Sequence, residues 1–316
     1  MKLLLVPVLI ILFQFPVHSL FAGDICIPDS LSSWKSEGNF RFSFNQIGYK
    51  NWAQGGDNSF TGNSSFDYQL AYVSPKISLL STLNTGYGII ITSEDGIRKN
   101  DDKLQASSKL GYSISKKVKY SVLFDLKSQF TPGYKYPNDS VVVSDFFAPG
   151  YLTLSFGADW SPFEYLSILL SPASGKFTIV ANEELANSGK YGMKPAEYDT
   201  AGMMITPGQN FKGEFGMNFV INLTKKVMED VSLSSKLEFH NNYFAPDPKN
   251  RWNFDVDMET KINFTINKYL STLFYFHLLY DDDILISLYD DEGVEIGKGP
   301  RVQLKENLGV GLSVKF

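Results

Sequence analysis

The most constraining feature of the sequence is its last stretch, residues 302–316, in which apolar and polar side chains alternate. One face carries Val302, Leu304, Leu308, Val310, Leu312, Val314 and Phe316, interrupted only by Glu306. Strict period-two alternation predicts a β-strand with one apolar and one polar face. The strand runs to the last residue, whereas chain ends usually fray. We therefore expect this strand to be held against another one, as it would be if it closed a ring of strands.

The same alternation recurs along the chain, and we predict twelve strands in total. The predicted strands are residues 38–49, 59–72, 77–91, 103–115, 118–130, 150–160, 165–181, 210–223, 230–241, 251–267, 269–281 and 302–316. The seventh segment is interrupted by Pro172. Because proline cannot donate to a strand ladder, a bulge, a bend or a strand end is expected there.

The connections between the predicted strands are sorted by length. Short connections follow even-numbered strands, at residues 73–76, 116–117, 161–164, 224–229 and 268. Most longer connections follow odd-numbered strands, for example residues 92–102, 131–149, 182–209 and 282–301. Bacterial outer-membrane barrels have short periplasmic turns and long outer loops, whereas a soluble sandwich has no reason to sort its loops. We therefore predict an all-β, transmembrane, antiparallel up-and-down β-barrel of about twelve strands, with a margin of two.

Composition fits this class and excludes others. Mean hydropathy is −0.12, and no apolar run after residue 22 approaches the roughly 20 residues of a membrane-spanning helix. A membrane barrel spreads its hydrophobicity over alternate positions and uses aromatics at the membrane interfaces, and aromatics make up 15% of this chain. The single cysteine excludes an internal disulfide framework. With a net charge of −5 and no basic tract, nucleic acid is not an expected partner, and no cofactor is expected.

The N-terminus predicts where the chain is sent. A charged start, an apolar run and small residues are typical of a secretory signal peptide, which we expect over residues 1–22. Cleavage after Ser19 and cleavage after Ala22 both fit. A periplasmic segment over 23–37 and the barrel over 38–316 are expected to follow. The expected location is the bacterial outer membrane, with membrane lipid as the partner of the apolar face.

One loop departs from generic barrel design. After the first predicted strand the sequence reads Asn51, Trp52, Ala53, Gln54, Gly55, Gly56, Asp57 and Asn58. This stretch resembles the Asn-Trp-Ala-x-Gly-Gly signature of an uncharacterised outer-membrane barrel family from Bacteroidetes-type bacteria, filed as a domain of unknown function. The resemblance implies the fold and the location, and it implies no activity. Because the paired glycines permit positive backbone dihedrals, a tight turn is the expected role of the motif.

The C-terminus carries a second resemblance. An aromatic last residue preceded by alternating apolar residues resembles the assembly signal of bacterial outer-membrane barrels, and Phe316 stands at the aromatic position. The resemblance implies that the barrel-assembly machinery is a partner during biogenesis.

The polar strand faces are expected to line the lumen. The predicted lumen charges are Arg41, Asp67, Lys109, Lys119, Asp125, Lys127, Lys212, Glu214, Lys236, Glu238, Asp255, Asp257, Glu259 and Lys261. Asp255, Asp257 and Glu259 follow one another along one strand face, so neighbouring strands must supply cations or water. Rows of opposite charge either line a narrow pore or pair and close it, and a twelve-stranded barrel falls between filled and wide ones. We predict a narrow channel for ions or small polar solutes.

Two alternative functions remain. A non-transporting accessory barrel would bind a protein partner through its outer loops, and the loop 131–149, with Tyr134 and Phe147, is a candidate plug. An outer-membrane hydrolase would need a base, and after the signal peptide the chain has only His240 and His277, both expected in the lumen. A lipase-type site of this class faces lipid at the outer rim. We therefore expect no catalysis and assign no catalytic or metal-binding residue.

Overall fold

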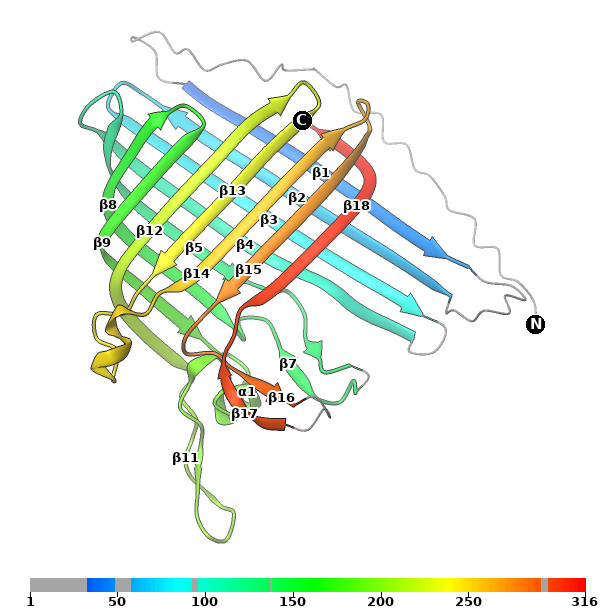
Figure 1. Cartoon of the computed structure of the whole chain (residues 1–316), viewed down its shortest axis with the longest axis vertical. Coiled ribbons are helices and arrows are strands. Elements are labelled where there is room, and N and C mark those ends of the chain that lie inside the picture. Colours follow the sequence, from blue (N-terminus) through cyan, green and yellow to red (C-terminus); the bar gives the residue numbers. More distant parts are fainter. Residues whose placement is uncertain (1–32, 49–57, 93–95, 137, 291–294) are drawn as a thin grey trace.

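The computed structural model describes residues 33–48, 58–92, 96–136, 138–290 and 295–316. Twelve antiparallel strands close into a barrel, which confirms the predicted fold class (Figure 1). The barrel strands are β1 (Ser33–Ile47), β2 (Ser59–Val73), β3 (Ile77–Thr92), β4 (Gly96–Ser113), β5 (Val118–Ser128), β8 (Gly150–Phe163), β9 (Leu166–Ile179), β12 (Phe211–Met228), β13 (Val231–His240), β14 (Asp255–Thr265), β15 (Leu270–Tyr280) and β18 (Gln303–Lys315). Each strand pairs with the barrel strands before and after it in the chain, and β1 pairs with β18 to close the ring.

Strand β5 shows how the alternation builds the barrel wall. Its outward side chains include Val122 and Phe124, which are 39% and 41% exposed. Its inward side chains include Ser121 and Asp125, which are 1% and 4% exposed. Because large apolar residues are exposed and polar residues are buried around the ring, the exterior is apolar and the interior polar. A soluble barrel has the opposite arrangement.

One predicted long loop is wrong. Residues 92–102 were expected to be a loop, but β4 begins at Gly96 and pairs with β3 there. Asp102, the last residue of this stretch, is bound by neighbouring backbone. The Asp102 carboxylate accepts hydrogen bonds from the backbone N–H groups of Phe130 (2.8 Å) and Thr131 (2.9 Å). A polar run therefore extends the β3–β4 hairpin because the loop after β5 supplies its partners.

Two predicted boundaries are also wrong. The expected turn 224–229 is largely strand, because β12 continues to Met228 along β13. The expected strand 251–267 begins only at Asp255, because the 3-10 helix η2 (Pro248–Trp252) precedes it. Where a strand ends depends on how far its neighbour continues to pair with it. The sequence of one segment alone does not contain that information.

The irregularity at Pro172 is a bulge in β9. Along the pairing with β12, Gly216 lies opposite Ser174, whereas Asn218 lies opposite Ser171, so β9 contains an extra residue. Both serines are buried, Ser171 being 0% and Ser174 5% exposed. Because they lie three positions apart, the bulge reverses which positions of β9 point inward.

Gly157 of β8 lies against this bulge, and replacing it with alanine is expected to destabilise the barrel. A Cβ atom at Gly157 would lie 2.0 Å from the Leu170 carbonyl oxygen, which is backbone and cannot rotate away. We expect the free energy of unfolding to fall by about 1–3 kcal/mol, measured by urea unfolding in lipid vesicles. Gly62→Ala is the control, because the nearest atom there is a Phe60 side-chain carbon at 3.5 Å. Equal unfolding midpoints for the two variants would contradict the prediction.

The ring closes at a short seam between β1 and β18. In the described residues these strands share five residue pairs, beginning at Asn39↔Lys315, whereas β1 and β2 share fifteen. Two backbone hydrogen bonds between Gly38 and Phe316, of 2.7 and 2.9 Å, extend the seam. The Phe316 ring lies over Gly38 and 6.3 Å from the ring of Phe66, between centroids. The last aromatic residue therefore packs on the closing joint.

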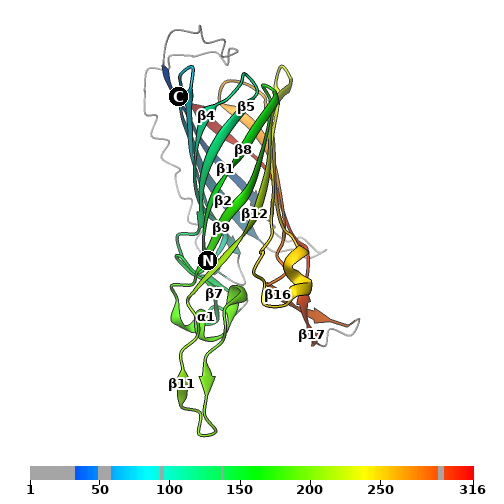
Figure 2. The same ribbon diagram turned by 90° about the vertical axis from the view of Figure 1, so that its left-hand side faces the viewer.

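The longer connections gather at one end of the barrel, here termed the loop end, and the short turns lie at the other, the turn end (Figures 1 and 2). Three hairpins stand at the loop end: β6 (Gly133–Tyr134) with β7 (Val142–Ser144), β10 (Glu197–Tyr198) with β11 (Met204–Thr206), and β16 (Leu285–Tyr289) with β17 (Glu295–Pro300). Helix α1 (Glu183–Asn187) lies beside them. In the described parts of the chain no helix is long and apolar enough to cross a membrane.

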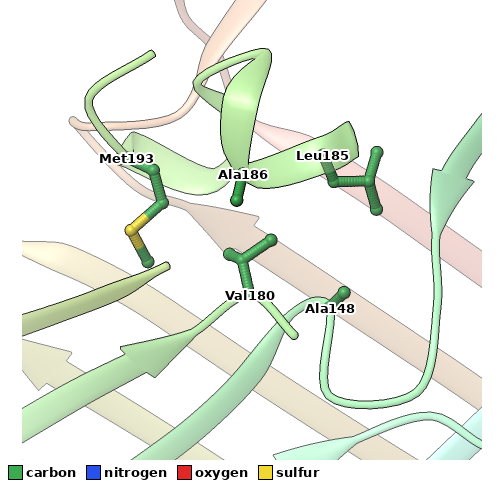
Figure 3. Packing of buried hydrophobic residues seen from close by; sticks show 5 residues of the cluster. All are labelled: Ala148, Val180, Leu185, Ala186 and Met193. Carbon is green, nitrogen blue, oxygen red and sulfur yellow. The ribbon is translucent and has the colours of Figure 1, made fainter. Parts of the chain in front are cut away.

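The loops after β5 and β9 pack into one unit, here termed the loop cap. Its buried residues are Ala148, Val180, Leu185, Ala186 and Met193 (Figure 3). Tyr191, in the 3-10 helix η1 (Lys190–Gly192), donates a hydrogen bond to the Val143 carbonyl. Burial raises the pKa of the Tyr191 phenol to about 12, so it stays a hydrogen-bond donor at neutral pH.

Candidate functional site

Charged side chains meet across the middle of the lumen. The Lys127 ammonium of β5 lies 2.8 Å from Asp257 of β14, 3.1 Å from Glu238 of β13 and 3.5 Å from Asp125 of its own strand. In the ring, β13, β12, β9 and β8 separate β14 from β5. Lys127 therefore ties opposite walls of the barrel together.

Two more lysines complete this layer. The Lys103 ammonium of β4 lies 2.5 Å from Glu259 of β14, and Gln105 donates to the other oxygen of that carboxylate at 2.7 Å. The Lys236 ammonium of β13 lies 3.1 Å from Asp125. We term this layer the septum; its members are Lys103, Lys127, Lys236, Asp125, Glu238, Asp257 and Glu259. Each buried charge is paired, as the cost of removing ions from water requires.

The septum lies between two cavities. The cavity on the loop side, the loop-side chamber, has a volume of about 250 Å³ and is lined by Lys103, Lys127 and Asp257, among others. The cavity on the turn side, the turn-side chamber, has a volume of about 530 Å³, and its lining includes Lys236 and Glu259. Gln105 and Asp125 line both. The septum is therefore the floor of one chamber and the roof of the other.

The loop-side chamber holds a second set of charges. The Lys176 ammonium lies 2.6 Å from Asp255 and 3.1 Å from Asp281. Burial alone would raise the pKa of the Asp281 carboxyl, but Lys176 beside it holds that pKa below its ordinary value. His240 is 5% exposed, and neither ring nitrogen has a hydrogen-bond partner among the described residues. The chamber thus contains an imidazole with unused donor and acceptor capacity.

Isolated two-residue contacts line the turn side of the lumen and the adjoining wall. They are Lys109 with Asp159 (2.5 Å), Lys119 with the Ser78 hydroxyl (3.0 Å), Lys261 with Asp67 (2.9 Å), and Arg41 with the side-chain oxygen of Asn263. Near the loop end, Lys212 contacts Glu214 (3.2 Å) and Asp283. All fourteen predicted lumen charges thus contact a lumen side chain, while their role as pore lining stays a prediction.

The structure adds lumen charges that were not on the predicted list. Lys176 follows the bulge at Pro172, where the inward positions of β9 change parity, so the alternation before the bulge misplaces it. Asp159 pairs with Lys109 and is 3% exposed. Lys103 stands at the edge of the stretch expected to be a loop, although its parity matches that of Gln105. That shared parity was the signal that would have found it.

The expected plug contributes little to the lumen. Of the described residues in the segment 131–149, only Pro149 lines the loop-side chamber, and the segment contributes to the loop cap and the β6–β7 hairpin. The expected signal peptide, 1–22, lies outside the described residues, as do the motif residues Asn51, Trp52, Ala53, Gly55 and Gly56. Asn58, the last motif residue, is exposed just before β2.

Both expected lumen histidines face the loop-side chamber. His277 Nε2 lies 2.9 Å from an Asp257 oxygen, which resembles the Asp–His half of a hydrolytic triad. Within the described residues neither imidazole hydrogen-bonds a serine or threonine hydroxyl. The contacts therefore do not assemble the nucleophile–base pair that a serine hydrolase uses.

Comparisons with known proteins give one family match. A family model described as "Protein of unknown function (DUF3078)" matches residues 44–134, which include the motif loop. A search of curated proteins gives no match. The bacterial source implied by the motif stays an expectation.

Solved structures give barrel neighbours. An outer membrane channel from Pseudomonas putida F1 is 10% identical, covers 89% of this chain and 95% of its own, and has a TM-score of 0.37. The translocator domain of the autotransporter NalP from Neisseria meningitidis is 10% identical, covers 89% and 87%, and has a TM-score of 0.37. An outer membrane phospholipase from Salmonella typhi, solved as a calcium-bound dimer, is 11% identical, covers 88% and 90%, and has a TM-score of 0.31. What the present barrel does has to follow from its own residues.

Proposed function

We propose that this chain is an outer-membrane β-barrel that forms a narrow channel for small cations and small polar solutes, constricted at the level of the septum. The observation that carries the proposal is the pair of polar chambers that meet at one layer of ion pairs. In such a channel a solute would pass from one chamber to the other, and the septum between them would be the constriction.

The apolar exterior supports a membrane location. In lipid every backbone polar group must be paired within the protein, and a closed ladder satisfies this without an edge. Tyr120, Trp160 and Tyr269 lie near the short turns and are 55%, 49% and 55% exposed, which is where an interfacial aromatic girdle would stand. Membrane lipid would therefore contact the strand exteriors, with the turn end in the periplasm.

The charge balance supports a preference for cations. The septum has three lysines and four carboxylates, so it carries one more negative than positive charge when all are ionised. In the loop-side chamber, Lys176 stands between two further carboxylates, Asp255 and Asp281. A path with fixed negative charge raises the local concentration of cations and lowers that of anions.

Conductance in a planar bilayer tests the proposal. We expect the refolded barrel to show small, cation-selective currents, because the septum leaves only a narrow path. Replacing Asp255, Asp257 and Glu259 with their amides should move the reversal potential in a KCl gradient toward anion preference. Gln69→Ala, in the wall of the turn-side chamber, changes no charge and is the control. Silence from the intact barrel and from variants with an opened septum would overturn the channel.

A non-transporting accessory role is the second candidate, and one observation favours it. The β10–β11 hairpin projects beyond the loop cap, away from the barrel (Figure 2). Near its tip, Met203 and Ile205 are 69% and 65% exposed, and Met204 between them is 47% exposed. Exposed apolar side chains on a projecting hairpin are suited to contact with a protein partner. A silent barrel that loses a co-purifying partner when this hairpin is deleted would establish the accessory role.

A further inference from the structure

The loop-side chamber brings together both histidines of the described chain. The chain has three histidines: His18 lies outside the described residues, and both others, His240 and His277, line this one cavity. They come from different strands, β13 and β15, so their meeting in one cavity is produced by the fold. Imidazole is the commonest side-chain ligand of transition metals in proteins.

His277 stands beside two carboxylates with the spacing of a metal-ligand set. Asp257 and Glu259 are alternate residues of β14 and point to the same side, and His277 of β15 is directly opposite Glu259 in the register. One ligand atom from each of the three lies within 4.8 Å of the others. The His277 Nε2 and an Asp257 oxygen are already 2.9 Å apart.

We propose that Asp257, Glu259 and His277 form a binding site for a divalent transition-metal ion such as Zn²⁺. One nitrogen and two carboxylate oxygens are a ligand set that Zn²⁺ accepts, with water completing the coordination. Ca²⁺ and Mg²⁺ prefer oxygen ligands alone, so the imidazole favours a transition metal over them.

The two carboxylates are paired with lysines, and those lysines have other partners. When Lys127 leaves Asp257, it still has Glu238 at 3.1 Å and Asp125 at 3.5 Å. When Lys103 leaves Glu259, it still has the Tyr275 hydroxyl at 3.3 Å and the face of that ring at 5.0 Å. Lys127 therefore keeps two carboxylates when the metal binds, and Lys103 keeps the Tyr275 hydroxyl and ring, which limits the cost of displacing the two ammonium groups.

His240 is the second, independent observation. Its side chain is nine-tenths buried, lines the same chamber, and has no partner for either nitrogen among the described residues. A buried polar group without a partner costs free energy unless a water or a ligand satisfies it. In the strand register His240 is opposite Asp255, two positions from Asp257, so it marks the chamber as a place for water or an ion and is not itself a ligand of the site.

Zn²⁺ titration of the refolded, untagged barrel tests the site. Histidine-selective isotope labelling of the mature barrel gives signals from His240 and His277 alone, so NMR follows both rings without any substitution. We expect substoichiometric Zn²⁺ to shift the His277 ring signals strongly and those of His240 less. By calorimetry, His277→Ala and Asp257→Asn should each weaken Zn²⁺ binding at least tenfold. Asp159→Asn, which changes a buried carboxylate that pairs with Lys109 outside the loop-side chamber, should change it less than twofold.

Three results would overturn the site. They are the absence of binding at millimolar Zn²⁺, a larger loss from His240→Ala than from His277→Ala, and equal affinity for Ca²⁺ and Zn²⁺. The NMR titration keeps the test valid if a variant does not fold. The site does not depend on the proposed channel, because a barrel that binds Zn²⁺ but never conducts would overturn the channel and leave the site in place.

Discussion

A barrel in which Lys127 is replaced by alanine is expected to conduct cations several-fold better than the wild type and to be less stable. Lys127 contacts Asp125, Glu238 and Asp257, and its loss leaves Lys236 as the remaining lysine beside Asp125 and Glu238 and no lysine beside Asp257 among the described residues. Those carboxylates attract cations to the narrowest level of the path. Removing one partner of a buried ion pair costs about 3–5 kcal/mol, which urea unfolding in lipid vesicles measures alongside bilayer conductance.

Lys119→Ala is the matched control for this prediction. Lys119 also points into the lumen, but among the described residues its ammonium makes one hydrogen bond, to the Ser78 hydroxyl at 3.0 Å. Its removal should cost about 1 kcal/mol and leave conductance unchanged. Equal conductance of Lys127→Ala and the wild type would show that the septum is not the barrier, even if stability falls as expected.

Replacing Phe124 with arginine should destabilise the barrel in the membrane. Phe124 is near the middle of β5, on the outer face, and is 41% exposed. An arginine on the lipid face near the bilayer midplane costs about 2–4 kcal/mol, to which the loss of an apolar side chain adds. Urea unfolding in lipid vesicles measures the change, and Phe124→Leu, which keeps the face apolar, should be nearly neutral.

The stability difference between the arginine and leucine variants distinguishes an outer face that contacts lipid from one that contacts water. On a water-facing wall the arginine at Phe124 would be tolerated as well as the leucine. Equal stability of the two variants would therefore contradict lipid contact at this face and, with it, the proposed location.

The alternation of apolar and polar residues was sufficient to predict the class of fold and the strand number. The pattern is informative because successive side chains of every barrel strand point alternately outward and into the lumen, whichever strands are its neighbours. It failed where the neighbours decide, as at residues 96–102, where the loop after β5 binds the Asp102 carboxylate and Lys305 of β18 binds Asp101.

The septum could not be predicted from the sequence, although most of its members were listed as lumen charges. Lys103 and Glu259 are 156 positions apart, and only the closed ring brings them within 2.5 Å. Alternation states which side of a strand a residue occupies, but not the height at which it meets the opposite wall. The proposed metal site was missed for the same reason, because His277 meets Glu259 only through the β14–β15 register.

The short joint between β1 and β18 has a mechanical consequence. A ring under sideways tension parts where the fewest bonds resist, and five residue pairs here stand against fifteen between β1 and β2. Thermal widening of the wall will therefore concentrate at this one joint instead of being shared around the circumference. Phe316, packed across it on Gly38, acts as the latch that holds the two ends of the sheet together.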